Sequence, residues 1–565
     1  TGSKATFAST VSFINSGSSS GSSQYQVASG TSDTAIFNGA VTTTNTGSSP
    51  NTIYYFGNGN SSYVSISSLA LSNTGSGTNT NYNFAAGGAS NVAILAGSTI
   101  TNAGTGTNDI LNFANGVGST VSFPTGMTFF NSSPGGNSAI NVSSGNGSFV
   151  TFNGTSTFNN KSTGTNGTIS IASGTSSNVT MSGPAIFNNT ETGTNGNTYI
   201  SNGNSSLTTF SSTLAVNNNG TATNNNIVDI ANATSSGVLF NGNVTFNNSA
   251  TGSTAYIRVD EGATSTATFN GAYNINNTGI AANCYVRTAL QGTVICNGNI
   301  IVSNTSTAAG TNGIYFAWPG WTGTTTLSNG NTITNGSFPI GVLQMINFTQ
   351  VGGTSQAMTL TGTANMTIGP NSAFNGSVNF ISPQMYLNGC VYSGATSFLE
   401  KDGATNNTST GGNIFNSNTT IEDISTGKFT LANTTGDDFQ KSATFIQTGT
   451  GALQPTYLTT STFEGNISTL GTATAITFGA GGAAGISKID GTTTQNIFGA
   501  AAQTPTFTTL NMNQSVGDSE VLNVPINIST ALNLTTGTIK STTTYLPTML
   551  NASITTVGNT LSYVN

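Results

Sequence analysis

One pattern of residues recurs between Phe7 and Asn335 at intervals of about 29 residues. Each copy has an anchor, usually apolar, that is followed six positions later by the end of a strand-like run and eight positions later by asparagine. The anchors are Phe7, Phe37, Ile66, Ile94, Phe123, Phe152, Met181, Phe210, Phe240, Phe269, Cys296 and Leu327. The asparagines are Asn15, Asn45, Asn73, Asn102, Asn131, Asn160, Asn189, Asn218, Asn248, Asn277, Asn304 and Asn335, with one residue missing only before Asn73. Tandem repeats of this length are typical of solenoids.

A single copy shows what each turn contains. In residues 149–160, Val150, Phe152 and Phe158 are separated by even steps, so they fall on one face of an extended strand, which we predict to be the core face. Gly154 lies between the aromatic positions, where a small residue leaves room for a neighbour or permits a bend. A corner rich in Gly, Thr and Ser and a second apolar run follow. The sequence therefore predicts an all-β fold, a parallel β-solenoid with at least two strands per turn.

Stacking of equivalent residues explains the recurring asparagine. If successive turns pair in register, each side-chain amide can donate a hydrogen bond to the amide oxygen of the next turn, as in cross-β stacks. We therefore assign the twelve asparagines a structural role and no ligand.

The period becomes shorter toward the carboxyl end. Phe415, Phe439 and Phe463 recur at a spacing of about 24 residues, and the register loosens between Leu327 and Ile368. We predict a regular solenoid over residues 1–370 and a continuation with about 24 residues per turn over residues 371–565. Neither end has a distinctive polar cap, so we expect the chain to be part of a longer protein or to be capped by a partner.

The composition limits the possible partners. Only 4% of residues are charged, there is no His, and nine Lys plus Arg cannot form a stripe that follows nucleic-acid phosphates. No apolar run reaches the roughly 18 residues that a membrane-spanning helix needs. We expect neither a nucleic-acid partner nor a membrane-spanning segment.

The densest local cluster of charged residues lies near residue 260. Arg258, Asp260 and Glu261 are close in sequence, and Asp229, Arg258 and Arg287 are each one repeat apart. We predict an ion ladder in which Asp229 and Asp260 offset two stacked guanidinium groups. The alternative is a polysaccharide-cleaving site, which requires a carboxylate pair or a metal in a concave surface.

Cofactor and thiol chemistry have few candidates. Asp437 and Asp438 could bind calcium in a turn, although they lack the alternating pattern of a calcium loop. We otherwise expect no cofactor and no metal. Cys284, Cys296 and Cys390 have no metal-type spacing, and we expect Cys296, which occupies an anchor position, to be a buried thiol.

Both tryptophans, Trp318 and Trp321, flank a Pro-Gly turn in the segment FAWPGW. Such residues can stack on sugar rings, lie in a subunit contact or pack over an irregular turn, and the sequence leaves these readings open. Tyr54, Tyr55, Tyr285 and Tyr315 could line an outer face.

Several segments carry a family resemblance. YLNGCVYSGATSF at 386–398, STGGNIFNSNTTI at 409–421, the run 429–457, PTFTTLNMNQSVGD at 505–518 and the run 522–539 resemble very large secreted surface proteins of Bacteroidota, which contain long Phe-Asn-Gly and Thr-rich repeats. Residues 1–370 resemble them more loosely, through forms such as FNGNVTFNN. The resemblance implies export, by the type IX route, and attachment at or beyond the outer membrane. It also implies a role as an adhesin, a gliding-associated fibre or a multi-subunit appendage.

Together these observations favour the structural shaft of an extracellular bacterial surface fibre or adhesin, without catalysis. A neutral surface rich in Thr, Asn and Ser opposes side-by-side association little, so we expect a homo-oligomeric filament, with a cell-surface or glycan target. The alternatives are a carbohydrate-active β-helix enzyme that uses Arg258 and Asp260, and a glycan-binding stalk that uses Trp318 and Trp321.

Overall fold

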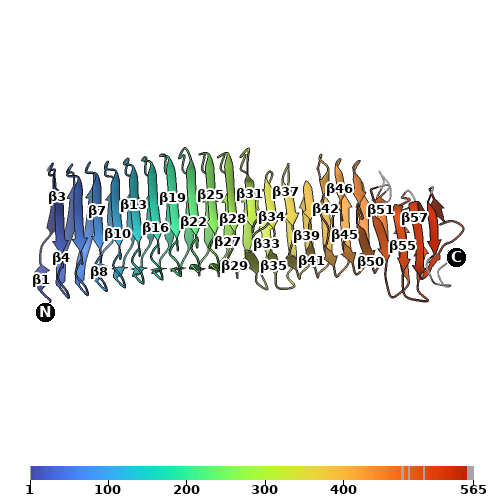
Figure 1. Ribbon diagram of the computed structural model, residues 1–565, viewed down its shortest axis with the longest axis horizontal. Coiled ribbons are helices and arrows are strands. Elements are labelled where there is room, and N and C mark those ends of the chain that lie inside the picture. Colours follow the sequence, from blue (N-terminus) through green and yellow to red (C-terminus); the bar gives the residue numbers. More distant parts are fainter. Residues whose placement is uncertain are drawn as a thin grey trace. The chain divides into compact units, whose positions relative to one another are not determined.

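The computed structural model describes residues 2–18, 20–471, 476–480, 484–500, 503–550 and 552–556. Every regular element in these ranges is a β-strand, and the strands pair in parallel to form about 18 turns of β-solenoid (Figure 1). The predicted fold class is therefore confirmed. The chain divides into two compact units, Thr1–Thr326 (unit 1) and Leu327–Asn565 (unit 2). The division that we predicted after residue 370 lies inside unit 2.

Most coils of unit 1 contain three strands. The first strands are β1 (Lys4–Phe7), β8 (Asn91–Ile94), β11 (Thr120–Phe123), β14 (Phe149–Phe152), β17 (Asn178–Met181), β20 (Leu207–Phe210), β23 (Gly237–Phe240), β26 (Thr266–Phe269) and β29 (Thr293–Cys296). The second strands are β2 (Val11–Asn15), β9 (Ser98–Asn102), β12 (Met127–Asn131), β15 (Ser156–Asn160), β18 (Ala185–Asn189), β21 (Leu214–Asn218), β24 (Val244–Asn248), β27 (Tyr273–Asn277) and β30 (Ile300–Asn304). In β4 (Thr34–Asn45) and β6 (Tyr63–Asn73) the first and second strands are continuous.

The third strands of unit 1 belong to a sheet that is separate from the one formed by the first and second strands, and we call their part of it the third-strand sheet. They are β3 (Ser22–Val27), β5 (Asn51–Phe56), β7 (Asn79–Phe84), β10 (Asn108–Phe113), β13 (Asn137–Val142), β16 (Asn166–Ile171), β19 (Asn195–Ile200), β22 (Asn225–Ile230), β25 (Thr254–Val259), β28 (Asn283–Thr288) and β31 (Asn312–Phe316). A further strand, β32 (Thr324–Leu327), spans the division between the units.

The anchors of successive coils stack directly on one another. Phe152 of β14 pairs in register with Met181 of β17, which pairs with Phe210 of β20. The rings of Phe123 and Phe152 are parallel, with centroids 4.7 Å apart, and Phe158 meets Phe152 edge-on at 5.6 Å. All five side chains are buried. The predicted stacking of equivalent residues is therefore confirmed.

A bend at Gly154 divides residues 149–160 into two strands. The chain bends between β14 and β15, and a Cβ atom at Gly154 would overlap the backbone of Gly126 in the preceding coil. A side chain at this position would push adjacent coils apart. The bend turns Phe158 toward Phe152 and closes the core.

The corner after each third strand is built from small residues in left-handed conformations. Ala172 and Ser176 have φ angles of 51° and 54°, and most other coils of unit 1 have a left-handed residue at each of these two positions. Ser177 turns inward, and its Oγ donates a hydrogen bond to Gly174 O at 2.7 Å. The corner thus satisfies its own buried hydroxyl.

Unit 2 contains three sets of strands. One set comprises β33 (Ile333–Asn335), β35 (Phe348–Gln350), β38 (Ser372–Phe374), β41 (Cys390–Tyr392), β44 (Ile414–Phe415), β47 (Asp438–Phe439), β50 (Thr460–Phe463), β52 (Thr477–Phe478), β53 (Ile486–Ile489), β55 (Thr506–Asn513), β57 (Ile526–Thr536), β59 (Pro547–Met549) and β60 (Ser553–Thr556). Another comprises β36 (Gln356–Thr359), β39 (Val378–Ser382), β42 (Thr396–Glu400), β45 (Thr419–Asp423), β48 (Ala443–Gln447), β51 (Ile467–Gly471), β54 (Gln495–Gly499), β56 (Ser519–Leu522) and β58 (Thr538–Lys540). The remaining strands are β34 (Val342–Met345), β37 (Asn365–Ile368), β40 (Gln384–Leu387), β43 (Asn407–Thr408), β46 (Lys428–Thr430) and β49 (Ala452–Gln454).

Phenylalanines stack in unit 2 as they do in unit 1. Phe415, Phe439 and Phe463 are register partners in successive coils, with ring centroids 4.7 and 5.0 Å apart. Eight residues after Phe374, Tyr392, Phe415 and Phe439, unit 2 has Ser382, Glu400, Asp423 and Gln447 in place of asparagine. These four residues are successive register partners.

Candidate functional site

The recurring asparagines of unit 1 form one continuous buried ladder. Nδ2 of each residue donates to Oδ1 of the next at 2.8–3.3 Å. The members are Asn15, Asn45, Asn73, Asn102, Asn131, Asn160, Asn189, Asn218, Asn248, Asn277 and Asn304. From Asn102 to Asn277 the same amide also bonds the backbone carbonyl seven or eight residues later, for example Asn189 to Gly196 O at 3.1 Å. The ladder thus joins neighbouring coils and also closes each coil.

The prediction is wrong for Asn335. Its amide donates to the carbonyls of Gly336 and Thr359, and its Oδ1 accepts from the Thr359 backbone nitrogen at 2.7 Å. The side chain is also only partly buried, unlike those of the ladder. Asn335 therefore bonds backbone groups of unit 2 and does not extend the ladder.

The predicted ion ladder exists, but Asp260 is not one of its members. Asp229, Arg258 and Arg287 are register partners on β22, β25 and β28. Arg258 Nε and Nη2 donate to Asp229 Oδ1 and Oδ2 at 2.7 and 2.6 Å. Arg287 makes the same two-pronged contact with Glu261, at 3.0 and 2.6 Å, and not with Asp260.

Asp260 faces the core because of its place in the corner. It follows β25 at the left-handed position, with a φ of 66°, where the adjacent coils have Ala231 and Ala289. Its carboxyl oxygens have no hydrogen-bond partner, and the nearby Ser265 hydroxyl donates to Gly262 O. Burial raises the pKa of Asp260 to about 7. The next residue, Glu261, therefore supplies the outward carboxylate.

Each guanidinium group lies over at least one aromatic ring. Arg258 lies 4.3 Å from the ring centre of Tyr256, and Arg287 lies 5.8 Å from that of Tyr285 and 5.4 Å from that of Trp318. The rings of Tyr256 and Tyr285 stack at 5.2 Å. We call Tyr256, Arg258, Tyr285, Arg287, Tyr315 and Trp318, with the counter-ions Asp229 and Glu261, the arginine–aromatic patch. It covers the outer face of β25, β28 and β31 and the start of the following turn.

The two tryptophans differ in their surroundings. Trp318 packs against Tyr315, with ring centres 4.8 Å apart, and is half-buried. Trp321 closes the turn, because its backbone nitrogen donates to Trp318 O at 3.1 Å, and it is 43% exposed. We expected four tyrosines on an outer face, and this prediction is wrong for Tyr54. Its side chain is completely buried and stacks on Tyr82.

Sequence reasoning missed one member of the patch, Tyr256. It also missed that Glu261 is the counter-ion of Arg287 and that Trp318 contacts Arg287. A compositional signal was available. Both Arg and both Trp residues of the whole chain fall between residues 258 and 321. Rare residue types that gather on one face indicate a local requirement that the other coils lack.

The carboxyl groups proposed for chemistry do not converge. Asp437 faces inward and accepts hydrogen bonds from the backbone and side-chain nitrogens of Asn413, both at 2.8 Å, while Asp438 is a strand neighbour that contacts Gln440. The two carboxylates therefore point to different partners. Among the residues described, no three Asp, Glu, Cys or His side chains are close enough to hold a metal ion.

Other carboxyl groups are buried in the core. Glu191 accepts hydrogen bonds from the Asn160 amide and the Gly167 backbone nitrogen, both at 3.2 Å, and fills the space that Gly167 leaves. Burial raises its pKa to about 9. Glu400 and Asp423 are stacked in unit 2, where burial and the neighbouring Asp423 raise the pKa of Glu400 to about 8. None of these groups reaches an open surface.

The three cysteines are buried free thiols. Cys284 is hydrogen-bonded to Asn277 of the ladder at 3.1 Å, and burial raises its pKa to about 11. Cys296 occupies its anchor position, as predicted.

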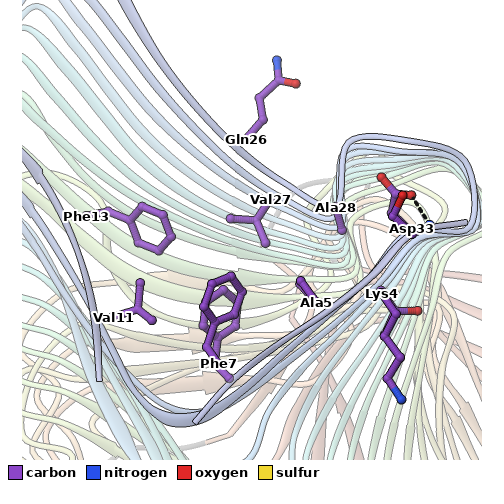
Figure 2. Close-up of a pocket in the computed structure, with 13 residues that line it drawn as sticks. Lys4, Ala5, Phe7, Val11, Phe13, Gln26, Val27, Ala28 and Asp33 are labelled. Atoms are coloured by element: carbon purple, nitrogen blue, oxygen red, sulfur yellow. Dashed lines mark hydrogen bonds between the residues drawn. The ribbon is translucent and has the colours of Figure 1, made fainter. Parts of the chain in front are cut away.

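A hollow lies at the exposed face of the first coil. It has a volume of about 320 Å³ and is lined mainly by apolar side chains, with Phe7, Phe13, Val11 and Val27 around it (Figure 2). Its one carboxylate, Asp33, already accepts hydrogen bonds from the backbone nitrogens of Ser3 and Gly30. The hollow offers apolar contact and no converging polar groups.

The described residues contain no helix that is long and apolar enough to cross a membrane. Comparisons with protein-family models, with characterised proteins and with solved structures find no significant match to this chain.

Proposed function

We propose that this chain is the structural shaft of an extracellular bacterial surface fibre or adhesin that assembles as a homo-oligomeric appendage. The observation that carries the proposal is the continuous amide ladder from Asn15 to Asn304. Each coil of unit 1 is held by its neighbours through an amide column and stacked core side chains. Such a structure grows by repetition and transmits load along its columns.

The outer surface of unit 1 supports this role. Asparagines on the third-strand sheet form a second, outward ladder through Asn51, Asn79, Asn108, Asn137, Asn166, Asn195 and Asn225. Their amide bonds are 2.8–3.1 Å long. Because the outer face of the strands from β3 to β19 has no charged side chain, little repulsion opposes the lateral approach of a second shaft there.

The disposition of the carboxyl groups supports a role without catalysis. A general acid or base must reach the substrate with a free proton or lone pair. Asp229 and Glu261 each bind an arginine in a two-pronged contact, and Asp260 faces the core. This cluster therefore lacks the accessible carboxylate pair that a polysaccharide-cleaving enzyme would need.

The proposal is tested on the native particle. We expect protease treatment of intact cells to remove the protein, and negative-stain imaging of gently sheared material to show laterally associated filaments. The polar composition and the family resemblance lead us to expect secretion by the type IX route, which a secretion-deficient strain would reveal as intracellular retention. Recovery of monomers only, or full protection from protease, would contradict the proposal.

A further inference from the structure

The arginine–aromatic patch departs from the pattern of its own columns. On the third-strand sheet, the outward column that contains Asn112, Asn141 and Ser170 continues with Tyr199, Asp229, Arg258, Arg287 and Tyr315. Coils with Asn or Ser in this column fold in the same register as those with Arg or Tyr. The core therefore does not require these side chains, and their presence calls for another explanation.

The patch is rigid before any ligand arrives. Each guanidinium group is fixed by two hydrogen bonds to one carboxylate and lies over an aromatic ring. The side chains of Arg258 and Arg287 are 22% and 10% exposed. A preorganised face loses little conformational entropy on binding.

Its charges cancel. Arg258 and Arg287 are balanced by Asp229 and Glu261. A polyanion gains little from such a face. A cationic ligand would have to displace the guanidinium groups that already lie over Tyr256 and Trp318. The electrostatics therefore favour a neutral ligand.

Arg258 has a nitrogen donor outside its contact with Asp229, and Trp321 has an exposed side chain. The contact with Asp229 uses Nε and Nη2 of Arg258, whereas Nη1 is 3.6 Å from Glu261 Oε2, which is longer than a hydrogen bond. Trp321, in the turn beside the patch, is 43% exposed. A ligand that fits has hydroxyl groups for planar polar side chains and an apolar C–H face for an indole ring.

We propose that the arginine–aromatic patch, together with Trp321, is a binding site for a neutral polysaccharide. One hexopyranose ring stacks on the indole of Trp321 or Trp318, and its hydroxyl groups accept hydrogen bonds from Arg258. The face is open rather than enclosed, so it accepts an internal segment of a long chain. This site deepens the proposed surface role by naming a target, and it rests on that role only for access to extracellular glycans.

The chain provides its own probe, because both of its tryptophans are in or beside the patch. The full-length protein is titrated with a β-glucan, a galactomannan and a dextran while tryptophan emission is recorded, and binding is checked by affinity electrophoresis. We expect a saturable change in emission with at least one of these neutral polymers. Alginate and hyaluronate serve as acidic comparisons and should bind more weakly.

Variants then locate the site. Trp321→Ala, which alters an exposed turn, should weaken polysaccharide binding in affinity electrophoresis about tenfold. This is the loss expected for one stacking contact. Arg258→Lys keeps the charge but loses the two-pronged bond to Asp229, and should also weaken binding. Tyr55→Ala is the matched control, because Tyr55 lies in the same outward column on β5, far along the sheet, and should bind as the parent does.

The proposal is overturned if none of the neutral polymers binds, if only the acidic ones bind, or if Trp321→Ala binds as tightly as the parent protein. Circular dichroism of each variant verifies that the fold is retained. Since binding is measured on isolated chains and assembly on native particles, either proposal can fail without the other.

Discussion

The coils around Asn160 in unit 1 and the coils around Asp423 in unit 2 have similar aromatic columns but different polar columns. Phe123 and Phe152 stack at 4.7 Å, and so do Phe415 and Phe439. Eight residues after the anchor, however, unit 1 has asparagine, whereas unit 2 has Ser382, Glu400, Asp423 and Gln447. The apolar column is thus retained while the polar column changes.

The difference follows from hydrogen-bond chemistry. An asparagine amide both donates and accepts, so a column of identical residues satisfies itself at any length. An ionised carboxylate only accepts, and two stacked carboxylates repel each other unless one is protonated. The asparagine column of unit 1 therefore contains no titratable member, whereas the equivalent column of unit 2 contains two carboxyl groups and must respond to pH.

The largest expected effect tests the shared aromatic column. Phe152→Ala and Phe439→Ala should each lower the local free energy of opening by about 4 kcal/mol, because each leaves a cavity in a stack of rings. Amide hydrogen exchange in the affected coil measures this quantity. The outward neighbour Thr151→Ala is the control. A loss below about 1 kcal/mol in either unit would show that the two columns are not equivalent.

The amide ladder should give the next largest effect. Asn218→Ala removes the acceptor of Asn189 and the donor to Asn248 and to the Asn226 carbonyl. We expect a loss of about 3 kcal/mol, since buried groups remain unpaired. Asn217→Ala, the adjacent residue in an outward ladder, should cost less than about 1 kcal/mol because water replaces its bonds. Equal losses at the two positions would contradict the role of the buried ladder.

The stability of unit 2 should fall as pH rises. Burial and Asp423 raise the pKa of Glu400 to about 8, above the ordinary value of 4.5. The protonated Glu400 carboxyl therefore makes its full contribution to the stability of the folded state below about pH 4.5. This contribution is lost as the pH rises toward 8, because the unfolded chain ionises while Glu400 in the folded chain stays protonated. We expect unit 2 to be about 2 kcal/mol less stable at pH 8 than at pH 5.

Glu400→Gln should reduce the pH dependence of opening in the coils of β42 and β45, and Glu422→Gln, an outward neighbour on β45, should not. Hydrogen exchange across β42 and β45 at both pH values provides the measurement. A unit 2 that is equally stable at pH 5 and pH 8 would argue against the buried carboxyl pair.

The smallest effect distinguishes Asp260 from Glu261. Asp260→Ala should stabilise unit 1 by about 1 kcal/mol at pH 8, because it removes a buried carboxyl at a position where adjacent coils have alanine. Glu261→Ala should destabilise it by about 1 kcal/mol, because Arg287 loses its partner. Thermal unfolding at pH 8 compares the two. Destabilisation of similar size by both changes would restore Asp260 to the ion ladder.

Much of the fold could be predicted because the repeat gives the register directly. Once Phe152, Met181 and Phe210 are recognised as equivalent, parallel stacking follows from their spacing, and the asparagines follow with them. The close packing of Gly154 on the backbone of Gly126 in the neighbouring coil was harder to predict. Spacing alone does not reveal such a close approach.

The site was predicted less completely because side-chain direction depends on local backbone conformation. Asp260 and Glu261 are adjacent, and only the left-handed φ of Asp260 decides which one faces the arginines. In the same way, Asn335 matched the sequence motif but lies where the register of the ladder has ended. Tyr256 was overlooked because the spacing of charged residues, rather than of rare residues of every kind, guided the search.

The central claim is that the coils of unit 1 stack in register along one column. Pairs of spin labels test it directly, with one label at Thr266 and the other at Thr120, Asn91 or Thr34. These three positions are five, six and eight coils from Thr266 in the same column. Pulsed electron resonance should give distances of about 24, 29 and 38 Å, an increase of about 4.8 Å per coil. Distances that do not increase with the number of intervening coils would contradict it.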